Sequence, residues 1–265
     1  MIYKNRNLNW KPSRPEKFGR YYQAPSFKSL PSSVDLRKSC APVKDQGEFG
    51  ACSGFSSSVA TEFLELKELK SNLPPSIAEL EYMDGHFCPV SPMFIYNNER
   101  LIEGTPLSQD AGATTLVDAC KTLTIKGVCR ETTFPYTPEN LQVVPPAAAY
   151  AEAAVHKVPK YWAIQQSGYQ MMSCLAEGYP FLFGIVVFDS MMSDEVAQTG
   201  QVPLPTDGDS QVGGHALCCV GYEHKSHWIF QNSWGPKWGD KGFGYLPWEY
   251  LLDPQLGDDF LTLRY

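Results

Sequence analysis

The sequence predicts an α+β protein with two lobes, in which helices come first and strands follow. Apolar residues recur mainly at helical spacing from 45 to 140. From 141 to 265, short runs rich in β-branched and aromatic residues are separated by Gly, Pro and Asp. A helical half followed by a β half is typical of an α+β fold. We expect the two halves to form separate lobes, with the binding site in the cleft between them.

Three helices are expected in the first half. The first runs from 53 to 73, where Pro74 stops it. The second runs from 92 to 102, with Ser91 as its N-cap and a proline at its first position. The third runs from about 114 to 126 and ends before a glycine, a residue that often terminates a helix.

Four strands are expected in the second half, at 181–188, 215–222, 227–232 and 242–246. Each is a short apolar run bounded by residues that favour turns. Cys218 and Cys219 are adjacent in the second of these runs, so their side chains point to opposite faces of the strand and are expected to pack.

Composition excludes several classes of protein. The chain has 265 residues, of which 43% are hydrophobic, enough for a sizeable core in one or two domains. Its 22 basic and 29 acidic residues argue against a general nucleic-acid-binding protein. No apolar run is long enough to span a membrane. The first 18 residues lack the apolar core of a secretion signal, which favours an intracellular or virion-associated protein. We expect a monomer without cofactor or metal.

Charge divides the chain near Pro31. Residues 1–30 hold seven basic side chains and one acidic one, a net charge of +6. The remaining residues hold 15 basic and 28 acidic side chains, a net charge of −13. This asymmetry predicts a basic N-terminal extension at 1–30, followed by the main domain at 31–265.

The eight cysteines do not form an obvious disulfide framework. Their number is even, but their spacings do not repeat and a chain of this length does not need covalent staples. We expect few or no disulfides. Cys218, Cys219, His224 and His227 could in principle bind a metal, but they lack the paired cysteines of zinc-finger spacing.

Cys52 is the candidate nucleophile. It lies between a glycine-rich loop and the first helix, where unpaired backbone N–H groups and the helix dipole stabilise a thiolate. We therefore expect a thiol of unusually low pKa. A thiol nucleophile needs a base and an orienting partner, and His215 and Asn232 at the ends of adjacent strands can supply them. Gln46, six residues before Cys52, can donate to an oxyanion together with the Cys52 N–H.

Four stretches, taken in order, resemble the papain family of cysteine peptidases. They are LPSSVDLRKSCAPVKDQGEFGACSGF (30–55), GVCRETTFPY (127–136), GGHALCCVGY (213–222) and NSWGPKWGDKGFGY (232–245). The likeness extends from about Pro31 to Leu263. It implies a papain-like α+β fold with a helical left lobe, a β-barrel-like right lobe and the active site in the cleft between them.

The resemblance also implies roles for single residues. Gln46 resembles the oxyanion glutamine, Cys52 the nucleophile, His215 the general acid/base and Asn232 the orienting amide. The implied substrate-binding residues are Gly112, whose backbone pairs with extended substrate, Gly214, and Trp234, which shields the Asn–His hydrogen bond. Asp258 or Asp259 is expected near the floor of the subsite that binds the residue two before the cut, which should therefore tolerate Arg or Lys.

Two residues near Cys52 depart from the family's usual pattern. Phe49 stands where a cysteine is usual, and Ser53 stands where a tryptophan is usual. Both departures resemble the short papain-like enzymes of bacteria, archaea and viruses, and the G-G-H-A sequence is similar to cathepsin B. No His-His insertion like the occluding loop of that enzyme is found.

Three functions fit these observations. The leading one is an endopeptidase that hydrolyses polypeptides through an acyl-enzyme on Cys52. A transpeptidase or ligase could use the same acyl-enzyme. A catalytically silent module could instead hold peptides or an inhibitor, but such relatives would have lost a catalytic residue and all four are present here.

The basic extension is a candidate propeptide-like inhibitor. Papain-like enzymes are commonly made with an inhibitory N-terminal segment, and 1–30 holds aromatic residues able to anchor it, among them Trp10, Phe18, Tyr21, Tyr22 and Phe27. Opposite charges should attract the extension to the body. Acid should weaken this attraction by protonating the carboxylates of the body. The alternative is an extension that braces the body without entering the cleft.

Overall fold

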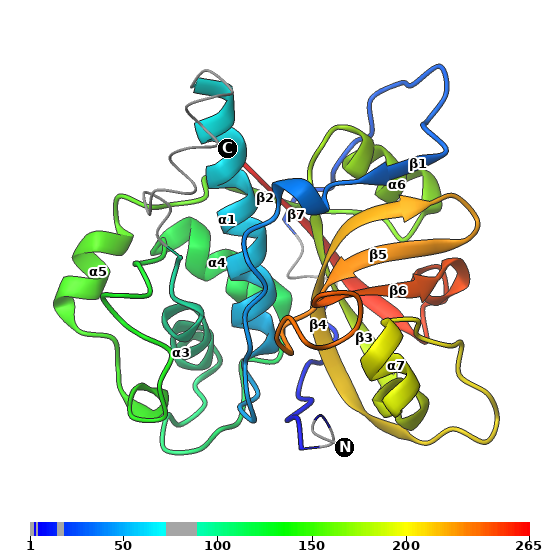
Figure 1. Cartoon of the computed structure of the whole chain (residues 1–265). Helices are drawn as coiled ribbons and strands as arrows, with labels where there is room; N and C mark the ends of the chain where they lie inside the picture. The colour runs from blue at the N-terminus through cyan, green and yellow to red at the C-terminus, as the bar shows by residue number, and fades with distance from the viewer. Residues whose placement is uncertain (1–2, 4, 15–18, 73–88) are drawn as a thin grey trace.

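One half of the molecule is mainly helical, and the other half contains the sheet (Figure 1). The computed structural model describes residues 3, 5–14, 19–72 and 89–265. The helical half consists of α1 (Cys52–Asn72), α3 (Pro92–Glu103), α4 (Leu116–Ile125) and α5 (Ala147–Ala153). All three expected helices are therefore present, within two residues of their expected ends. The two-lobed α+β prediction is confirmed.

Local sequence explains how α3 is delimited. The Ser91 hydroxyl accepts a hydrogen bond from the Phe94 N–H at 3.0 Å, which makes Ser91 the N-cap that its position before Pro92 predicted. Gly104 ends the helix at φ 73°, a left-handed conformation that glycine adopts without strain. The helix is buried from Pro92 to Arg100, so it forms the centre of the helical half.

The other half is an antiparallel sheet of seven strands. Its strands are β1 (Ser33–Asp35), β2 (Lys160–Ala163), β3 (Phe181–Phe188), β4 (Gln211–Glu223), β5 (His227–Gln231), β6 (Phe243–Pro247) and β7 (Gly257–Arg264). The order is β2-β7-β3-β4-β5-β6, and β1 pairs with β4. All four expected strands are present, and β1, β2 and β7 are additional.

The sheet is open, which corrects the expected barrel-like lobe. Along the strand order, β2 and β6 stand at opposite ends, and the described strands do not close into a ring. The sheet carries α6 (Gly168–Ala176) and α7 (Asp194–Thr199) on its side of the molecule (Figure 1). Four short 3-10 helices complete the described elements: Arg37–Ser39, Asn140–Gln142, Asp189–Met192 and Trp248–Leu251.

Two apolar cores share β4 between them. One lies between the sheet and the helical half, and includes Phe55, Phe94 and Cys218; the other includes Trp228 and Cys219. Adjacent cysteines thus enter different cores, which confirms the packing role predicted from strand alternation. Among the described cysteines, six buried ones are free thiols: Cys52, Cys120, Cys129, Cys174, Cys218 and Cys219. His86 and Cys88 lie outside the described residues.

No helix among the described residues is long and apolar enough to cross a membrane.

Candidate active site

Cys52 lies where the helical half meets the sheet. It is the first residue of α1, and α1 packs against β4, the strand that carries His215 (Figure 1). The Cys52 thiol also interacts with the backbone of Ala216, the residue after His215. Both side chains are fully buried. The fold therefore brings together a thiol and an imidazole that are 163 positions apart in the chain.

Asn232 is hydrogen-bonded to the His215 ring. Its Oδ1 lies 2.9 Å from Nε2 of His215, and the two residues come from β4 and the end of β5, which pair in the sheet. The Trp234 ring stacks on the imidazole with 4.9 Å between centroids and 25° between planes. Asn232 and Trp234 are themselves buried, so the hydrogen bond is kept from water. This is the geometry that the sequence motif implied.

Gln46 is held beside this pair by Ser233. Its Oε1 accepts the Ser233 hydroxyl at 2.5 Å, and the two backbones are joined by a 2.8 Å bond from Gln46 N to Ser233 O. The Gln46 Nε2 donates to Phe49 O at 2.9 Å, within the loop that leads to Cys52. The amide is thus fixed between the thiol loop and the Asn232 loop. Its role as an oxyanion donor stays a prediction.

The thiol and the imidazole are both neutral in this structure. Burial raises the pKa of Cys52 to about 12. Burial also lowers the pKa of His215 to about 4, against the hydrogen bond that its ring donates to Asn232 Oδ1, which favours the charged form. The sequence predicted a thiol of unusually low pKa. The difference arises because the mouth of α1 is not open to water here, so desolvation outweighs the helix dipole.

The residue that covers the thiol is Asn9 of the N-terminal extension. The Cys52 Sγ donates to Asn9 Oδ1 at 3.6 Å, and Asn9 Nδ2 donates to Gly112 O at 3.0 Å. His215 Nδ1, in turn, has no hydrogen-bond partner among the described residues. A side-chain amide from the extension therefore takes the hydrogen bond that a thiol and an imidazole could otherwise share.

The extension binds both walls of the cleft through its backbone. On the sheet side, Trp10 N donates to Gly214 O at 3.1 Å and Gly214 N donates to Leu8 O at 3.4 Å. On the helical side, Lys11 N donates to Thr114 O at 2.9 Å. A Cβ at Gly214 would lie 2.1 Å from Trp10 O, so this close approach requires glycine. Gly112 and Gly214, two predicted substrate-binding residues, both contact the extension.

The Trp10 indole fills a pocket next to the thiol. Its ring lies over Gly184, where an added Cβ would come within 1.8 Å of the indole. Its Nε1 donates to Asp259 Oδ2 at 3.1 Å, and Ser13 donates to the same carboxylate from its N at 2.9 Å and from its Oγ at 3.0 Å. Trp10 is only 4% exposed. Sequence reasoning named neither Gly184 nor this pairing of Asp259.

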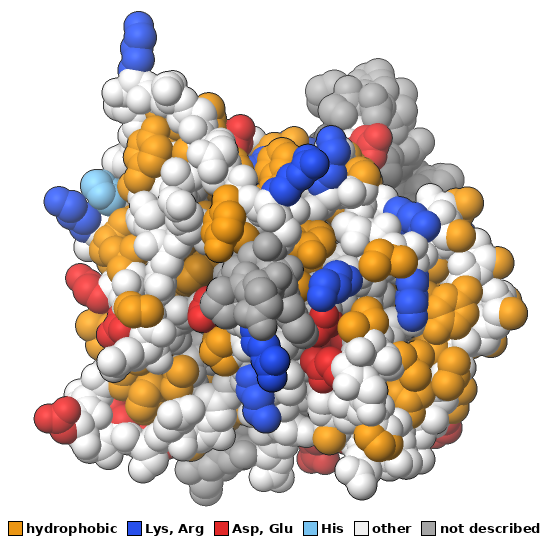
Figure 2. Space-filling model, turned by 180° about the vertical axis from the view of Figure 1, so that it is seen from behind, with side chains coloured by type: hydrophobic (Ala, Val, Ile, Leu, Met, Phe, Trp, Pro, Cys, Tyr) orange, Lys and Arg blue, Asp and Glu red, His pale blue; other side chains and the backbone are white. Residues whose placement is uncertain are grey.

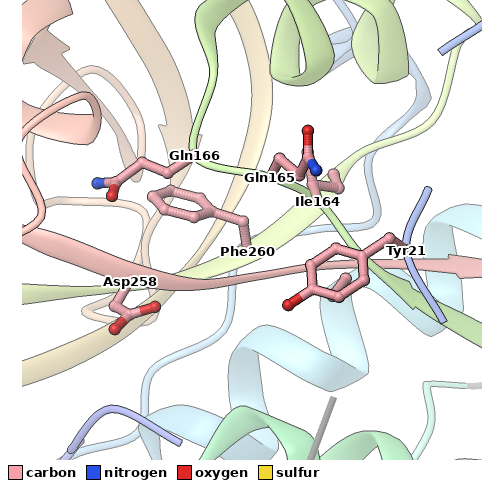
Figure 3. Close-up of a pocket in the computed structure, with 7 residues that line it drawn as sticks. Tyr21, Ile164, Gln165, Gln166, Asp258 and Phe260 are labelled. Carbon is pink, nitrogen blue, oxygen red and sulfur yellow. The ribbon is translucent and has the colours of Figure 1, made fainter. Parts of the chain in front are cut away.

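Asp258 faces a different pocket from its neighbour. This open pocket has a volume of about 310 Å³, and Figure 3 shows Asp258 and Tyr21 on opposite sides of it. Gln165, Gln166 and Phe260 complete much of its lining. Of the two adjacent acids, Asp259 is fully buried and contacts the residue that occupies the cleft. A substrate-binding role for Asp258 stays a prediction.

The other aromatic residues that were expected to anchor the extension differ in how deeply they are buried. Tyr22 is buried, Phe27 is half-buried and Tyr21 is 47% exposed, while Phe18 lies outside the described residues. The Tyr3 ring stacks on Trp234 with 6.3 Å between centroids.

Charge contributes less to docking than composition suggested. Arg6 Nη1 forms an ion pair with Asp45 Oδ1 at 2.7 Å. Lys11, Arg14, Arg20 and Lys28 are exposed. Lys and Arg side chains also lie near the middle of the rear face of the molecule, with an acidic patch directly beside them (Figure 2). Because exposed charges are screened by salt, we attribute docking mainly to Trp10 and the backbone hydrogen bonds.

No cluster of three metal-ligating side chains is found in the described part of the chain.

Comparisons with known proteins agree with this geometry. A family model described as papain family cysteine protease matches residues 30–249. An uncharacterised peptidase C1-like protein of Acanthamoeba polyphaga mimivirus is 36% identical over 229 residues, covering 83% of this chain and 68% of the viral protein. The crystal structure of xylellain, a cysteine protease from Xylella fastidiosa, superposes with a TM-score of 0.82 at 30% identity, covering 98% of this chain and 97% of xylellain.

More distant relatives are longer than this chain. Cathepsin K of Gallus gallus is 25% identical over 242 residues, which cover 88% of this chain but 64% of the relative.

Proposed function

Since the chain belongs to the papain family of cysteine proteases, we propose that it is an endopeptidase whose nucleophile is Cys52. The observation that carries the proposal is the buried 2.9 Å hydrogen bond between His215 and Asn232, beneath Trp234 and next to the thiol at the start of α1. A thiol, a base and an orienting amide in this arrangement have the parts that thioester chemistry needs.

The reaction follows from the roles of these groups. The Cys52 sulfur attacks the carbonyl carbon of a peptide bond, and the negative charge on the oxygen is stabilised by the Cys52 N–H and the Gln46 amide. His215 donates its proton to the leaving amine, which breaks the C–N bond and leaves a thioester. His215 then takes a proton from water, which attacks the thioester and regenerates the thiol. Asn232 keeps the imidazole in the required orientation throughout.

Residues 1–30 inhibit this site in the chain as it stands. Three contacts support this role: Asn9 takes the hydrogen bond of the thiol, Trp10 fills the adjacent pocket, and Lys11 occupies the opposite wall. A substrate must displace all three to reach Cys52. These contacts favour inhibition over the bracing role that the sequence left open.

Displacement of the extension also allows Cys52 to become a reactive thiolate. Water that enters the site removes the desolvation that now keeps both groups neutral. A proton can then pass from Cys52 to His215, which yields a thiolate and an imidazolium. This transfer stays within the site and takes no proton from solvent, so it adds little pH dependence to docking itself.

Asp259 makes docking stronger in acid, opposite to the expectation from charge. Burial raises its pKa to about 6 from an ordinary value of 3.8, against the hydrogen bonds from Ser13 and Trp10 that favour the ionised form. When the extension leaves, the carboxyl regains water and its pKa falls toward the ordinary value. The docked state therefore holds a proton more tightly, and this stabilisation is present below about pH 4 and lost as pH rises through about 6.

The proposed nucleophile is tested by replacing it. Cys52→Ala should abolish hydrolysis of unstructured peptides, whereas Cys40→Ala, at a half-buried thiol away from the cleft, should retain it. Circular dichroism should show both variants folded. Turnover in Cys52→Ala above about one hundredth of the wild-type rate would exclude Cys52 as the nucleophile, because removal of a nucleophile usually costs far more.

A further inference from the structure

Glu99 is a fully buried acid that the proposed reaction does not use. It lies on α3 and reaches the residue after the nucleophile: the Ser53 hydroxyl is 2.6 Å from Glu99 Oε2. Ser53 is the position at which the sequence departs from the family's usual tryptophan. A small side chain beside the nucleophile leaves space, and Glu99 extends into that space from the neighbouring helix.

The hydrogen bonds around Ser53 show where the protons lie. Its single hydroxyl hydrogen has two acceptors in reach, Glu99 Oε2 at 2.6 Å and Ala113 O at 3.0 Å. The hydroxyl can donate to one of them only. If Glu99 is a neutral carboxylic acid, it donates to the Ser53 oxygen and Ser53 donates to Ala113 O, so that both bonds are made.

The surroundings of Glu99 also favour its neutral, protonated form. Its Oε1 has no hydrogen-bond partner among the described residues, which is far less costly for a neutral acid than for a buried carboxylate. The titratable groups that interact with it come from all three helices around it and are acids, thiols and a phenol: Cys52 on α1, Tyr96 and Glu103 on α3, and Asp118 and Cys120 on α4. Burial, with Glu103 and Asp118 nearby, raises the pKa of Glu99 well above its ordinary value.

The Ala113 carbonyl belongs to the helical wall of the cleft. Ala113 has φ 51° and Gly112 has φ 81°, two successive residues in a left-handed conformation, which costs energy for alanine. Glu103, one turn after Glu99 on α3, accepts the N–H groups of Ala113 and Thr114 at 2.8 and 2.9 Å. Two glutamates on one face of α3 therefore support the wall formed by residues 112–114. Glu103 binds this wall directly, and Glu99 binds it through Ser53.

We infer that Glu99 is a neutral positioning residue, which fixes the substrate-binding wall 112–114 to the nucleophile helix through Ser53. The wall presents Gly112 O and Thr114 O to the chain that lies in the cleft, as their bonds to Asn9 and Lys11 show. An extended substrate would meet the same carbonyls. Only this last statement rests on the proposed function.

Hydrogen exchange in the full chain tests the inference without catalysis. In a Cys52→Ala background, the Lys11 amide reports on Thr114 O of the wall, and the neighbouring Trp10 amide reports on Gly214 O of the opposite wall. Ser53→Ala and Glu99→Leu should speed exchange of the Lys11 amide about tenfold relative to the Trp10 amide. Glu99→Gln, whose amide can still donate to Ser53, should leave the ratio within about twofold of its starting value.

Several outcomes would overturn the positioning role. Equal acceleration at Lys11 and Trp10 would mean a general loss of docking. An unchanged ratio in Ser53→Ala, which removes only one oxygen and should fold even if Glu99→Leu does not, would show that the link does not hold the wall. A Glu99→Gln ratio as altered as that of Glu99→Leu would show that the carboxyl does not act as a neutral donor.

Kinetics supply a readout that a purely structural role would not move. In a Trp10→Ala background, in which the extension no longer competes for the wall, Ser53→Ala should raise KM for extended peptides about tenfold with little change in kcat, and should leave a single-residue ester unaffected. The acid limb of the Cys52 alkylation profile should coincide for wild type and Glu99→Gln, because a neutral Glu99 exerts no charge on the thiol. A downward shift of that limb would refute the neutral form. Absence of any hydrolysis even in the Trp10→Ala background, in which the extension is released, would refute the proposed function but leave the exchange result decisive.

Discussion

Replacing Trp10 should release the extension from the cleft and expose Cys52. The indole is 4% exposed, lies over Gly184 and donates to Asp259. Truncation of a buried tryptophan to alanine typically costs about 3–5 kcal/mol. Because the body of the enzyme keeps its own core in either state, nearly all of this cost falls on docking. At about 1.4 kcal/mol per factor of ten, the open fraction should rise at least 100-fold.

The rate of Cys52 alkylation measures the open fraction. The thiol is fully buried when the extension is docked, so a thiol-directed epoxide reacts only with open molecules. Trp10→Ala should therefore speed modification about 100-fold or more, until the rate reaches that of a freely accessible thiol. Tyr21→Ala is the matched control, because Tyr21 is an aromatic residue of the same extension that is 47% exposed, and its loss should change the rate about twofold.

Two observations would refute this reasoning. Equal rates for Trp10→Ala and wild type would mean that the indole does not hold the extension in place. Modification of Cys120 or Cys174, both fully buried, would mean that the variant unfolds as a whole rather than opening at the cleft.

The remaining predictions concern chemistry, pH and specificity. Asn232→Ala should lower kcat about 10- to 1000-fold and His215→Ala should lower it further, as steady-state kinetics would show; an Asn232→Ala enzyme with the wild-type rate would disprove the orienting role. Exchange protection of the Lys11 amide, corrected for intrinsic rates, should rise about tenfold from pH 7 to pH 5 in Cys52→Ala protein, and Asp259→Asn should remove that rise. Peptide-library digestion should show cleavage inside chains, with basic side chains tolerated two residues before the cut; exclusive release of C-terminal dipeptides would contradict the first statement, and strict rejection of Arg and Lys the second.

Elements with a clear local signal could be predicted from the sequence. The α3 helix has a capping serine and a terminal glycine, and β3 is an unbroken apolar run, so both were placed within one or two residues. The short β2 has no comparable apolar run and depends on packing against the rest of the fold. The α7 helix does have a capping serine, Ser193, and a terminal glycine, Gly200, but its six residues are too few to show a helical period. The open sheet likewise reflects long-range pairing that local patterns do not encode.

The candidate site shows the same division. Cys52, His215 and Asn232 could be named because their chemistry and motifs are local, and the structure brings them together as expected. The contact of Asn9 with Cys52 joins residues 43 positions apart, and the contact of Trp10 with Asp259 joins residues 249 positions apart. The sequence around these residues contains no motif that predicts either contact. The neutral state of the thiol depends on burial by the extension. The low pKa expected from the helix N-terminus and a nearby imidazolium therefore does not describe the docked chain, and it stays a prediction for the open site.

Gly184 affects two properties of the protein at once, the docking of the extension and the choice of substrate. The space above it accepts the Trp10 indole of the chain itself. Gly184 pairs with Ala216, whose backbone interacts with the Cys52 thiol, so under the proposed function the same space would receive a substrate side chain. Any larger residue at 184 would narrow the choice of substrates and loosen self-inhibition in a single mutational step. A change of substrate preference through position 184 should therefore require a smaller residue at position 10 to keep the extension docked. We expect these two positions to covary among related sequences.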